Sequence, residues 1–219
     1  MSYNTVIFDF DLTLANSTKP ILTCYEETLS ACGYPARTKD EIFKMIGLDL
    51  VDGLSIISGE KDEEKLEIMR QTYVAKADEI MAQQTVFFDG SRELLASLRE
   101  KGVNTAIVTS KFRYRVIDTF QAQNSAEFIP DEIVGRDDVI IPKPDPTGLL
   151  EAISRFGTDK KSVLYVGDSF IDAKTAQNAG VNFAGVLTGS TTRKMFSEYP
   201  NVMVMENIKE LAKWIVNNL

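Results

Sequence analysis

A short apolar run that ends in two carboxylates is the feature that most constrains the fold of this 219-residue chain. Residues 3–8 (YNTVIF) have the length and composition of a buried strand, and Asp9 and Asp11 follow directly. In an open parallel sheet, ligands bind beyond the carboxyl ends of the strands. Two carboxylates separated by one residue repel each other there unless a cation or a shared proton compensates. The segment therefore suggests a metal-dependent site, although acidic residues after a strand also begin turns or cap helices.

Strand-like and helix-like segments alternate through residues 86–219. We expect strands near residues 104–108, 132–134, 162–166, 183–187 and 202–205, separated by helices at residues 91–101, 112–123, 147–156, 171–179 and 207–218. Such alternation is typical of a parallel sheet covered by helices. It predicts an α/β fold with a Rossmann-like parallel core made of residues 1–15 and 86–219.

Residues 16–85 lose the strand pattern and become helical. Pro20 suits a first helical position and Gly33 suits a helix stop. Thr38 and Glu41 form a capping-box pattern. A long amphipathic stripe follows, made of Leu66, Met69, Tyr73, Ala77 and Ile80. We expect a small helical domain inserted into the core, either able to close over a site at the sheet edge or a static decoration.

Two further polar clusters carry groups that suit phosphate. The hydroxyl and backbone N–H groups of Thr109 and Ser110, which follow the run at residues 104–108, suit phosphate oxygens at a helix start. The alternative is that these residues only cap the helix at residues 112–123. Lys143 lies between two prolines, which favour a fixed ammonium that binds phosphate as a point charge. A solvated surface lysine is the ordinary alternative.

The last cluster, Gly167-Asp168-Ser169, follows the strand-like run at residues 162–166, and Asp172 lies one helical turn further on. Glycine allows a close backbone turn, so that Asp168 and Asp172 can share one crevice with the first acidic pair. Magnesium is commonly held by one or two carboxylates together with waters and substrate phosphate. This cluster therefore favours magnesium over zinc.

Composition excludes several other classes of protein. A net charge of −8 argues against a nucleic-acid surface, which normally carries a basic stripe. The chain has no histidine, which excludes Ser-His hydrolysis, Cys-His proteolysis and histidine-bound metals. Neither a membrane span nor a signal peptide is apparent, so we expect a cytoplasmic location and no membrane partner. The sequence does not predict the oligomeric state.

With these four clusters in this order, the chain resembles the haloacid dehalogenase superfamily over nearly its whole length, in particular its phosphatases with an inserted helical cap, such as phosphoglycolate phosphatase. The resemblance implies a nucleophile at Asp9 and a general acid/base at Asp11. It also implies phosphate binding by Thr109, Ser110 and Lys143, and Mg²⁺ bound by Asp9, Asp11, Asp168 and Asp172. Leu12 departs from the family, which often has glycine there, but its presence removes no chemical group.

The expected activity is Mg²⁺-dependent hydrolysis of a small phosphate monoester, such as phosphoglycolate, through an aspartyl phosphate. A phosphosugar mutase is the main alternative, although Lys19 and Lys44 are the only evident basic residues of the cap that could hold a second phosphate. An inorganic pyrophosphatase or a 5′-nucleotidase would use the same core. A dehalogenase would not need Asp11 and Asp168, and a receiver-like signalling module would not need the cap. By likeness to the family, we expect residues 46–50 of the cap to reach the substrate.

Overall fold

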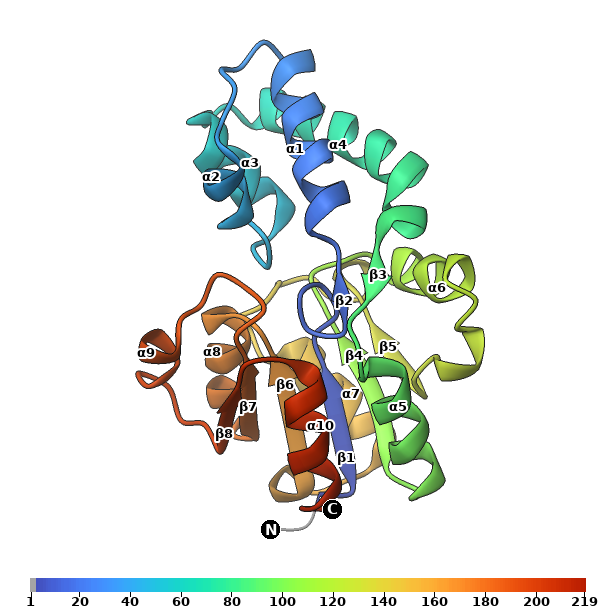
Figure 1. The fold of residues 1–219 in the computed structure, drawn as a ribbon. Helices are drawn as coiled ribbons and strands as arrows, with labels where there is room; N and C mark the ends of the chain where they lie inside the picture. Colours follow the sequence, from blue (N-terminus) through green and yellow to red (C-terminus); the bar gives the residue numbers. More distant parts are fainter. Residues whose placement is uncertain (1–2) are drawn as a thin grey trace.

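A six-stranded parallel sheet forms the lower part of the computed structural model, which describes residues 3–219 (Figure 1). Its strands, in sheet order, are β5 (Glu132–Val134), β4 (Asn104–Val108), β1 (Thr5–Phe8), β6 (Val163–Gly167), β7 (Asn182–Val186) and β8 (Met203–Met205). This confirms the expected α/β fold with a Rossmann-like core. Residues 1 and 2, which the expected core segment 1–15 includes, lie outside the described residues.

The position of β1 follows from its sequence. All four of its residues are buried, and it pairs with β4 on one side and β6 on the other. The order of the strands along the chain reverses between β1 and β6, and such a reversal opens a crevice at the carboxyl ends of the strands. Asp9 is the first residue beyond β1, and Asp168 is the first beyond β6. The topology therefore brings these two distant segments to one crevice.

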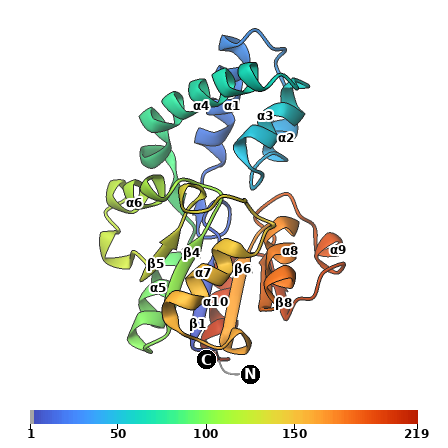
Figure 2. The ribbon, with the colours of Figure 1, turned by 180° about the vertical axis from the view of Figure 1, so that it is seen from behind.

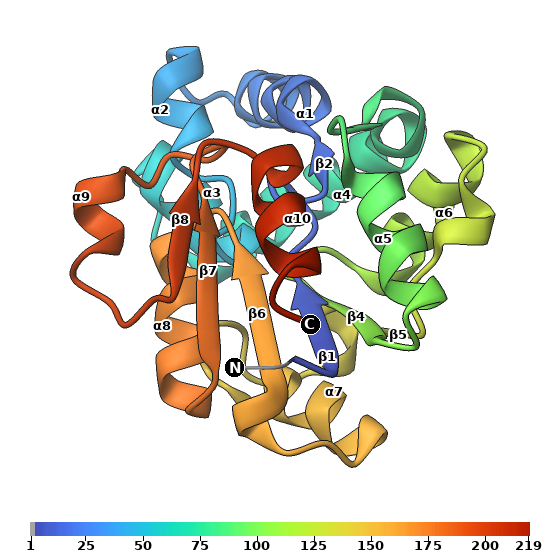
Figure 3. The same ribbon diagram turned by 60° about the horizontal axis from the view of Figure 1, so that its bottom comes forward.

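Two layers of helices bury the two faces of the sheet (Figures 2 and 3). One face is covered by α5 (Ser91–Glu100), α6 (Arg113–Ala122) and α10 (Ile208–Val216). The other is covered by α7 (Thr147–Phe156) and α8 (Phe170–Ala179), with the short α9 (Arg193–Phe196) contributing Phe196. The expected helices and strands agree with these bounds to within two residues, whereas α9 is absent from the expectation because four residues carry little periodic signal.

Four helices that follow β1 form a separate group above the sheet (Figure 1). These are α1 (Thr18–Ala31), α2 (Lys39–Phe43), α3 (Leu50–Ser58) and α4 (Glu63–Gln84), and they enclose a hydrophobic cluster of their own. The capping box of Thr38 and Glu41 is present at the start of α2. Pro20 is the third residue of α1 rather than the first, which the helix accepts because N–H groups in the first turn have no partner within the helix.

Two short strands connect the helices to the core. Ala15–Asn16 (β2) and Val86–Phe87 (β3) pair antiparallel, so the two crossings between the helices and the core form one ribbon. The sequence does not predict this ribbon because two residues are too few to show the alternation of a strand. We propose that β2 and β3 mark the boundary between a core of residues 1–15 and 86–219 and a cap of residues 16–85.

Leu12 links the loop after β1 to the cap. Its side chain is 2% exposed and packs in the hydrophobic cluster of the cap, although Leu12 itself belongs to the core segment. Its backbone has a φ of +61°, in the left-handed region that glycine adopts without strain. The leucine thus adds apolar contact with the cap at the expense of backbone strain.

This balance predicts an unusual order of stability among variants at position 12. Leu12→Ala loses the buried side chain but keeps the strained backbone, and we expect it to lower the free energy of unfolding by about 3 kcal/mol. Leu12→Gly loses the same contacts but relieves the strain, so it should be more stable than the alanine variant by about 1 kcal/mol. Urea denaturation of both variants measures the difference. An alanine variant more stable than the glycine variant would contradict this account.

Candidate active site

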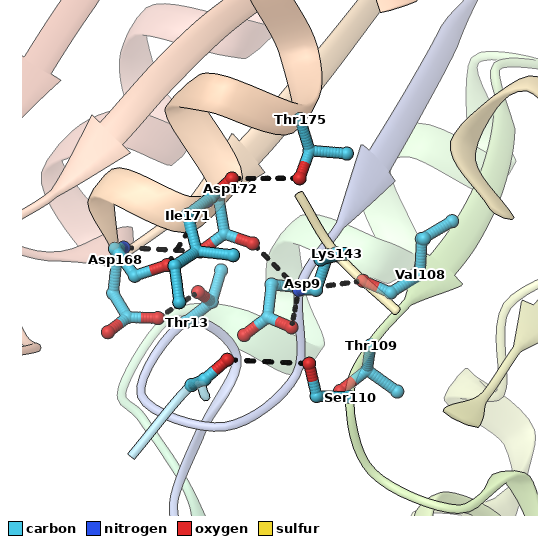
Figure 4. Close-up of polar contacts among 12 residues, drawn as sticks. Asp9, Thr13, Val108, Thr109, Ser110, Lys143, Asp168, Ile171, Asp172 and Thr175 are labelled. Carbon is cyan, nitrogen blue, oxygen red and sulfur yellow. Dashed lines mark hydrogen bonds and ion pairs between the residues drawn. The ribbon is translucent and has the colours of Figure 1, made fainter. Parts of the chain in front are cut away.

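The carboxyl ends of the central strands bring the predicted polar clusters together (Figure 4). Asp9 follows β1, Thr109 follows β4, and Asp168 follows β6, while Lys143 reaches the same point from the loop before α7. The side chains of Asp9, Thr109, Lys143 and Asp168 are all buried or nearly so. A set of charged groups withdrawn from water in this way must be compensated within the site.

Lys143 lies at the centre of this cluster. Its Nζ donates to Asp9 Oδ1 and to Asp172 Oδ1, at 2.7 Å in each case, and lies 3.2 Å from the hydroxyl of Tyr165. Burial alone would lower the pKa of Lys143, but the carboxylates of Asp172 and Asp9 raise it well above its usual value. The ammonium is therefore charged and fixed, as the flanking prolines suggest, and the alternative of a solvated surface lysine is wrong.

Asp172 is occupied by donors from the protein itself. Its Oδ1 accepts from Lys143 and from the hydroxyl of Tyr165 at 3.0 Å, and its Oδ2 accepts from the backbone N–H and the hydroxyl of Ser169. The same pair, Ser169 and Asp172, forms a capping box at the start of α8. This arrangement favours a role in positioning Lys143 over a role as a direct metal ligand.

Three buried carboxylates form a set of oxygens that suits a hard divalent cation. One oxygen each from Asp9, Asp168 and Asp172 lies within 4.8 Å of the other two. Asp168 is oriented by Thr13, whose hydroxyl donates to Asp168 Oδ1 at 3.1 Å. Lys143 supplies one positive charge against three carboxylates, so a divalent cation would complete the compensation. The donor set fits Mg²⁺, which binds oxygen ligands from one or two carboxylates.

The pKa values of the cluster show the same excess of negative charge over positive charge. Burial, with a further contribution from repulsion by Asp172, raises the pKa of Asp9 from 3.8 to about 7 despite the attraction of Lys143. Burial and the charges of Asp172 and Asp9 raise the pKa of Asp168 well above its usual value. Both carboxyls thus hold protons more tightly in the folded chain than in the unfolded chain when no cation is bound.

A pH dependence of stability follows for Asp9. Below about pH 4 this carboxyl is protonated in both states; between about pH 4 and 7 only the folded state keeps the proton, because folding raises its pKa from 3.8 to about 7. The free energy of unfolding contributed by Asp9 therefore falls across that window and stays low above it. In magnesium-free buffer, we expect Asp9→Asn to gain stability relative to the wild type as the pH rises from 4 to 7. A constant difference across this range would contradict the burial assigned to Asp9.

Asp11 lies apart from this set and faces Lys111 instead. The Nζ of Lys111 is 3.1 Å from Asp11 Oδ1, but the two groups are not aligned for a hydrogen bond, and Oδ1 has no other partner among residues 3–219. The carboxylate of Asp11 is therefore available to exchange a proton with a bound group. The structure does not bring it into the group of carboxylates that suits a metal.

The loop at residues 109–111 is held by contacts on both sides. The Oγ1 of Thr109 accepts from the backbone N–H of Lys111 at 3.2 Å, and the hydroxyl of Ser110 donates to the carbonyl of Gly47 in the cap at 3.4 Å. Helix α6 begins at Arg113 with Phe112 at the N-cap position. The alternative in which Thr109 and Ser110 only cap this helix is therefore wrong.

A cavity of about 100 Å³ lies between Asp9 and Asp11 of the core and the tip of the cap. From the cap it is lined by Ile46, Gly47, Leu48 and Leu50, together with Ile21, Tyr25, Met45, Tyr73 and Met81. From the core, Thr109, Ser110 and Lys111 line it with Phe112, Arg115 and Arg136. The expectation that the segment at residues 46–50 reaches down to the site agrees with this lining. This volume is below the roughly 300 Å³ at which pockets for drug-sized ligands begin, so it suits a small leaving group.

Four residues at this site are not assigned by the sequence. Lys111, Arg115 and Arg136 line the cavity, but a single basic residue in a loop or on a helix is usually solvated. Gly189 lies so close to Asp168 that a Cβ atom there would overlap Asp168 Oδ2. A glycine in a loop after β7 carries no signal of this contact without knowledge of the fold.

Comparison with known proteins places the chain in a family. The family model for haloacid dehalogenase-like hydrolases matches residues 6–186. The chain belongs to this family. It is 30% identical over 94% of its length to pyrophosphatase PpaX of Bacillus velezensis, of which the match covers 93%. A solved structure from Bacteroides fragilis, described as a haloacid dehalogenase-like hydrolase, is 38% identical with a TM-score of 0.92, over 96% of this chain and 100% of the other.

A protein from Haemophilus somnus, described as a predicted phosphoglycolate phosphatase, shares the fold with a TM-score of 0.86 at 20% identity over 98% of each chain. The expected haloacid dehalogenase family and the expected class of enzyme, a phosphatase hydrolase, are confirmed. Among residues 3–219, no helix combines the length and the apolar character needed to cross a membrane.

Proposed function

We propose that this haloacid dehalogenase-like hydrolase is a Mg²⁺-dependent phosphatase that acts on a small phosphorylated compound through a phosphorylated Asp9. The observation that carries the proposal is the position of Asp9 at the carboxyl end of β1, between the ammonium of Lys143 and the carboxylate of Asp168. A buried carboxylate held by a fixed cation and beside a set of metal-binding oxygens suits a nucleophile that attacks phosphorus.

Each residue of the site has its own role in the proposed reaction. A carboxylate oxygen of Asp9 attacks the phosphorus, while Asp11 donates a proton to the departing oxygen and then takes one from the water that hydrolyses the aspartyl phosphate. Lys143, Thr109 and Ser110 bind the oxygens of the phosphoryl group. Mg²⁺, held by Asp9 and Asp168, would neutralise charge on those oxygens, with Asp172 holding Lys143 in place. We propose no metal role for the side chain of Asp11.

The cap would exclude water from this chemistry. Its tip contacts the core through the Ser110–Gly47 hydrogen bond, and Arg136 of the core pairs with Asp49 of the cap, with 2.6 Å between Nε and Oδ2. Because the cavity under the cap is small, a substrate of larger size needs the cap to open. The hinge would lie in the β2–β3 ribbon, the only pair of crossings between cap and core within residues 3–219.

A small phosphate monoester such as phosphoglycolate is the first candidate substrate, since a cavity of about 100 Å³ favours a substrate with few atoms beyond the phosphoryl group. Inorganic pyrophosphate is the second candidate, which the similarity to pyrophosphatase PpaX favours. The cap lysines do not support the mutase alternative, because Lys19 and Lys44 are exposed and do not line the cavity. A 5′-nucleotide fits this volume less well than either candidate.

The test is phosphate release from pyrophosphate and phosphoglycolate with and without magnesium. We expect EDTA to abolish turnover and excess Mg²⁺ to restore it, and Asp168→Asn to raise the magnesium concentration that gives half-maximal rate by about 10-fold or more. Asp89→Asn is the matched control, since the Asp89 side chain is 92% exposed and lies outside the site. Full turnover in EDTA, or an unchanged magnesium requirement in Asp168→Asn, would count against the proposal.

A further inference from the structure

The side of the cavity next to Asp11 carries two cations that the proposed chemistry does not use. Lys111 follows β4 and Arg136 follows β5, and both line the cavity. Their backbones are joined, because the N–H of Arg136 donates to the carbonyl of Lys111 at 2.9 Å. Two neighbouring strands therefore present a pair of positive charges from one rigid support, beside the residue that protonates the leaving group.

Neither cation has its hydrogen-bonding capacity filled by the protein. The side chain of Lys111 is 5% exposed, yet within residues 3–219 its Nζ makes no hydrogen bond and has only the misaligned contact with Asp11 at 3.1 Å and the ring of Phe10, whose centroid is 6.0 Å away. Arg136 donates through Nε to Asp49 and through Nη1 to the carbonyl of Val139, while its Nη2 makes no hydrogen bond within residues 3–219. The ammonium of Lys111 is withdrawn from water without an aligned acceptor, which is unfavourable, and the side chain of Arg136 is 31% exposed, so its Nη2 is open to a ligand in the cavity. Both cations can therefore accept a further anion.

Arg115, the third cationic side chain that lines the cavity, already has hydrogen-bond partners in the protein. Arg115 donates through Nε and Nη2 to Asp78 and through Nη2 to the carbonyl of Val74, both on cap helix α4. It therefore serves as a contact between cap and core. The cap side of the cavity is largely apolar, and its lining includes Ile46, Leu48 and Leu50.

We infer that Lys111 and Arg136 form a subsite for a negative charge on the leaving group, so that the preferred substrate is a small phosphate ester or anhydride whose leaving group is itself anionic. The inference rests on the proposed function and adds to it the class of leaving group. Lys143 and the metal-binding carboxylates receive the transferred phosphoryl group, and Lys111 and Arg136 receive the carboxylate or phosphate that departs. The small cavity limits that group to a few atoms.

The test compares substrates that differ in the charge of the leaving group. Phosphoglycolate and pyrophosphate have anionic leaving groups, whereas 2-hydroxyethyl phosphate has a neutral one close in size to that of phosphoglycolate. The readout is the ratio of kcat/KM for the better anionic substrate to kcat/KM for 2-hydroxyethyl phosphate. We expect a high ratio for the wild type. In Arg136→Gln the ratio should fall about 30-fold, which corresponds to the loss of one hydrogen bond between charged groups. Lys111→Met should also lower the ratio. Because Lys111 contacts Asp11, this variant should in addition lower kcat/KM for both kinds of substrate.

Two further variants separate a binding role from a structural one. Arg113→Gln removes the same charge from an arginine near the site that does not line the cavity, and it should leave the ratio unchanged. Asp49→Asn removes the ion pair with Arg136 but keeps the side-chain oxygen that caps α3. If Arg136 only fastens the cap, Asp49→Asn will reproduce the effect of Arg136→Gln on all substrates. If Arg136 binds the leaving group, Asp49→Asn will keep the ratio or raise it.

The outcomes distinguish this inference from the proposal on which it rests. A wild type without preference for anionic leaving groups, or a ratio unchanged in Arg136→Gln, would overturn the inference and leave a phosphatase. Matching losses on all substrates in Arg136→Gln and Asp49→Asn would overturn it as well. Failure of the wild type to release phosphate from any of the three substrates would instead remove the proposed function. Thermal unfolding by circular dichroism confirms that each variant is folded.

Discussion

Asp9→Asn is expected to reduce kcat for phosphate release by about 10,000-fold or more, as removal of a nucleophile does in other covalent mechanisms. The amide keeps the size of the carboxylate but offers no anionic oxygen to attack phosphorus. Because Asp9 is buried with a pKa raised to about 7, its replacement also removes an unfavourable buried charge. The variant should therefore be folded, and at neutral pH without magnesium it should be at least as stable as the wild type.

This combination separates loss of chemistry from loss of fold. Steady-state phosphate release measures the first, and urea denaturation at pH 7.5 in EDTA measures the second. Asp89→Asn makes the same chemical change on the surface and should keep full activity. Turnover of Asp9→Asn within about 10-fold of the wild type would show that another group performs the attack.

Lys143→Met is expected to lower both activity and stability. The substitution leaves the carboxylates of Asp9 and Asp172 buried without their shared partner, and breaking a buried ion pair in this way costs about 3 kcal/mol or more. Loss of the ammonium from the phosphoryl site should lower kcat about 1,000-fold. The loss of stability should be larger at pH 8 than at pH 5, because protonation of Asp9 at the lower pH relieves the uncompensated charge.

Lys174→Met provides the control, since Lys174 is an exposed lysine on the same helix as Asp172. Denaturation curves at both pH values and phosphate release at saturating magnesium give the two effects. Equal stability of Lys143→Met and the wild type at pH 8 would mean that Lys143 does not compensate the buried carboxylates.

The parts of the fold that local sequence patterns define could be predicted. The largely apolar runs of β1 and its neighbours predict the parallel sheet. The order of the clusters along the chain predicts that Asp9, Thr109, Lys143 and Asp168 meet at one edge of that sheet. These predictions succeed because parallel strands place their carboxyl ends on the same side of a sheet.

The features that depend on packing between distant segments could not be predicted. The pairing of Arg136 with Asp49 joins residues 87 positions apart, and the contact of Lys111 with Asp11 joins two side chains that each suit solvent when considered alone. Leu12 is a similar case, since its left-handed backbone and its place in the cluster of the cap follow from the position of that cap. Charge pairs between the cap and the core have no periodic signal in the sequence.

The most direct test of the central claim is to trap the phosphorylated enzyme. Wild-type protein mixed with substrate and Mg²⁺, quenched in acid within milliseconds and digested, should yield a peptide containing Asp9 that carries one added phosphate. When the substrate carries a labelled phosphoryl group, the labelled phosphate on this peptide should disappear in a chase with unlabelled substrate. It should be absent from Asp9→Asn. Rapid phosphate release with no phosphate on Asp9, or with phosphate on a different residue, would contradict the account.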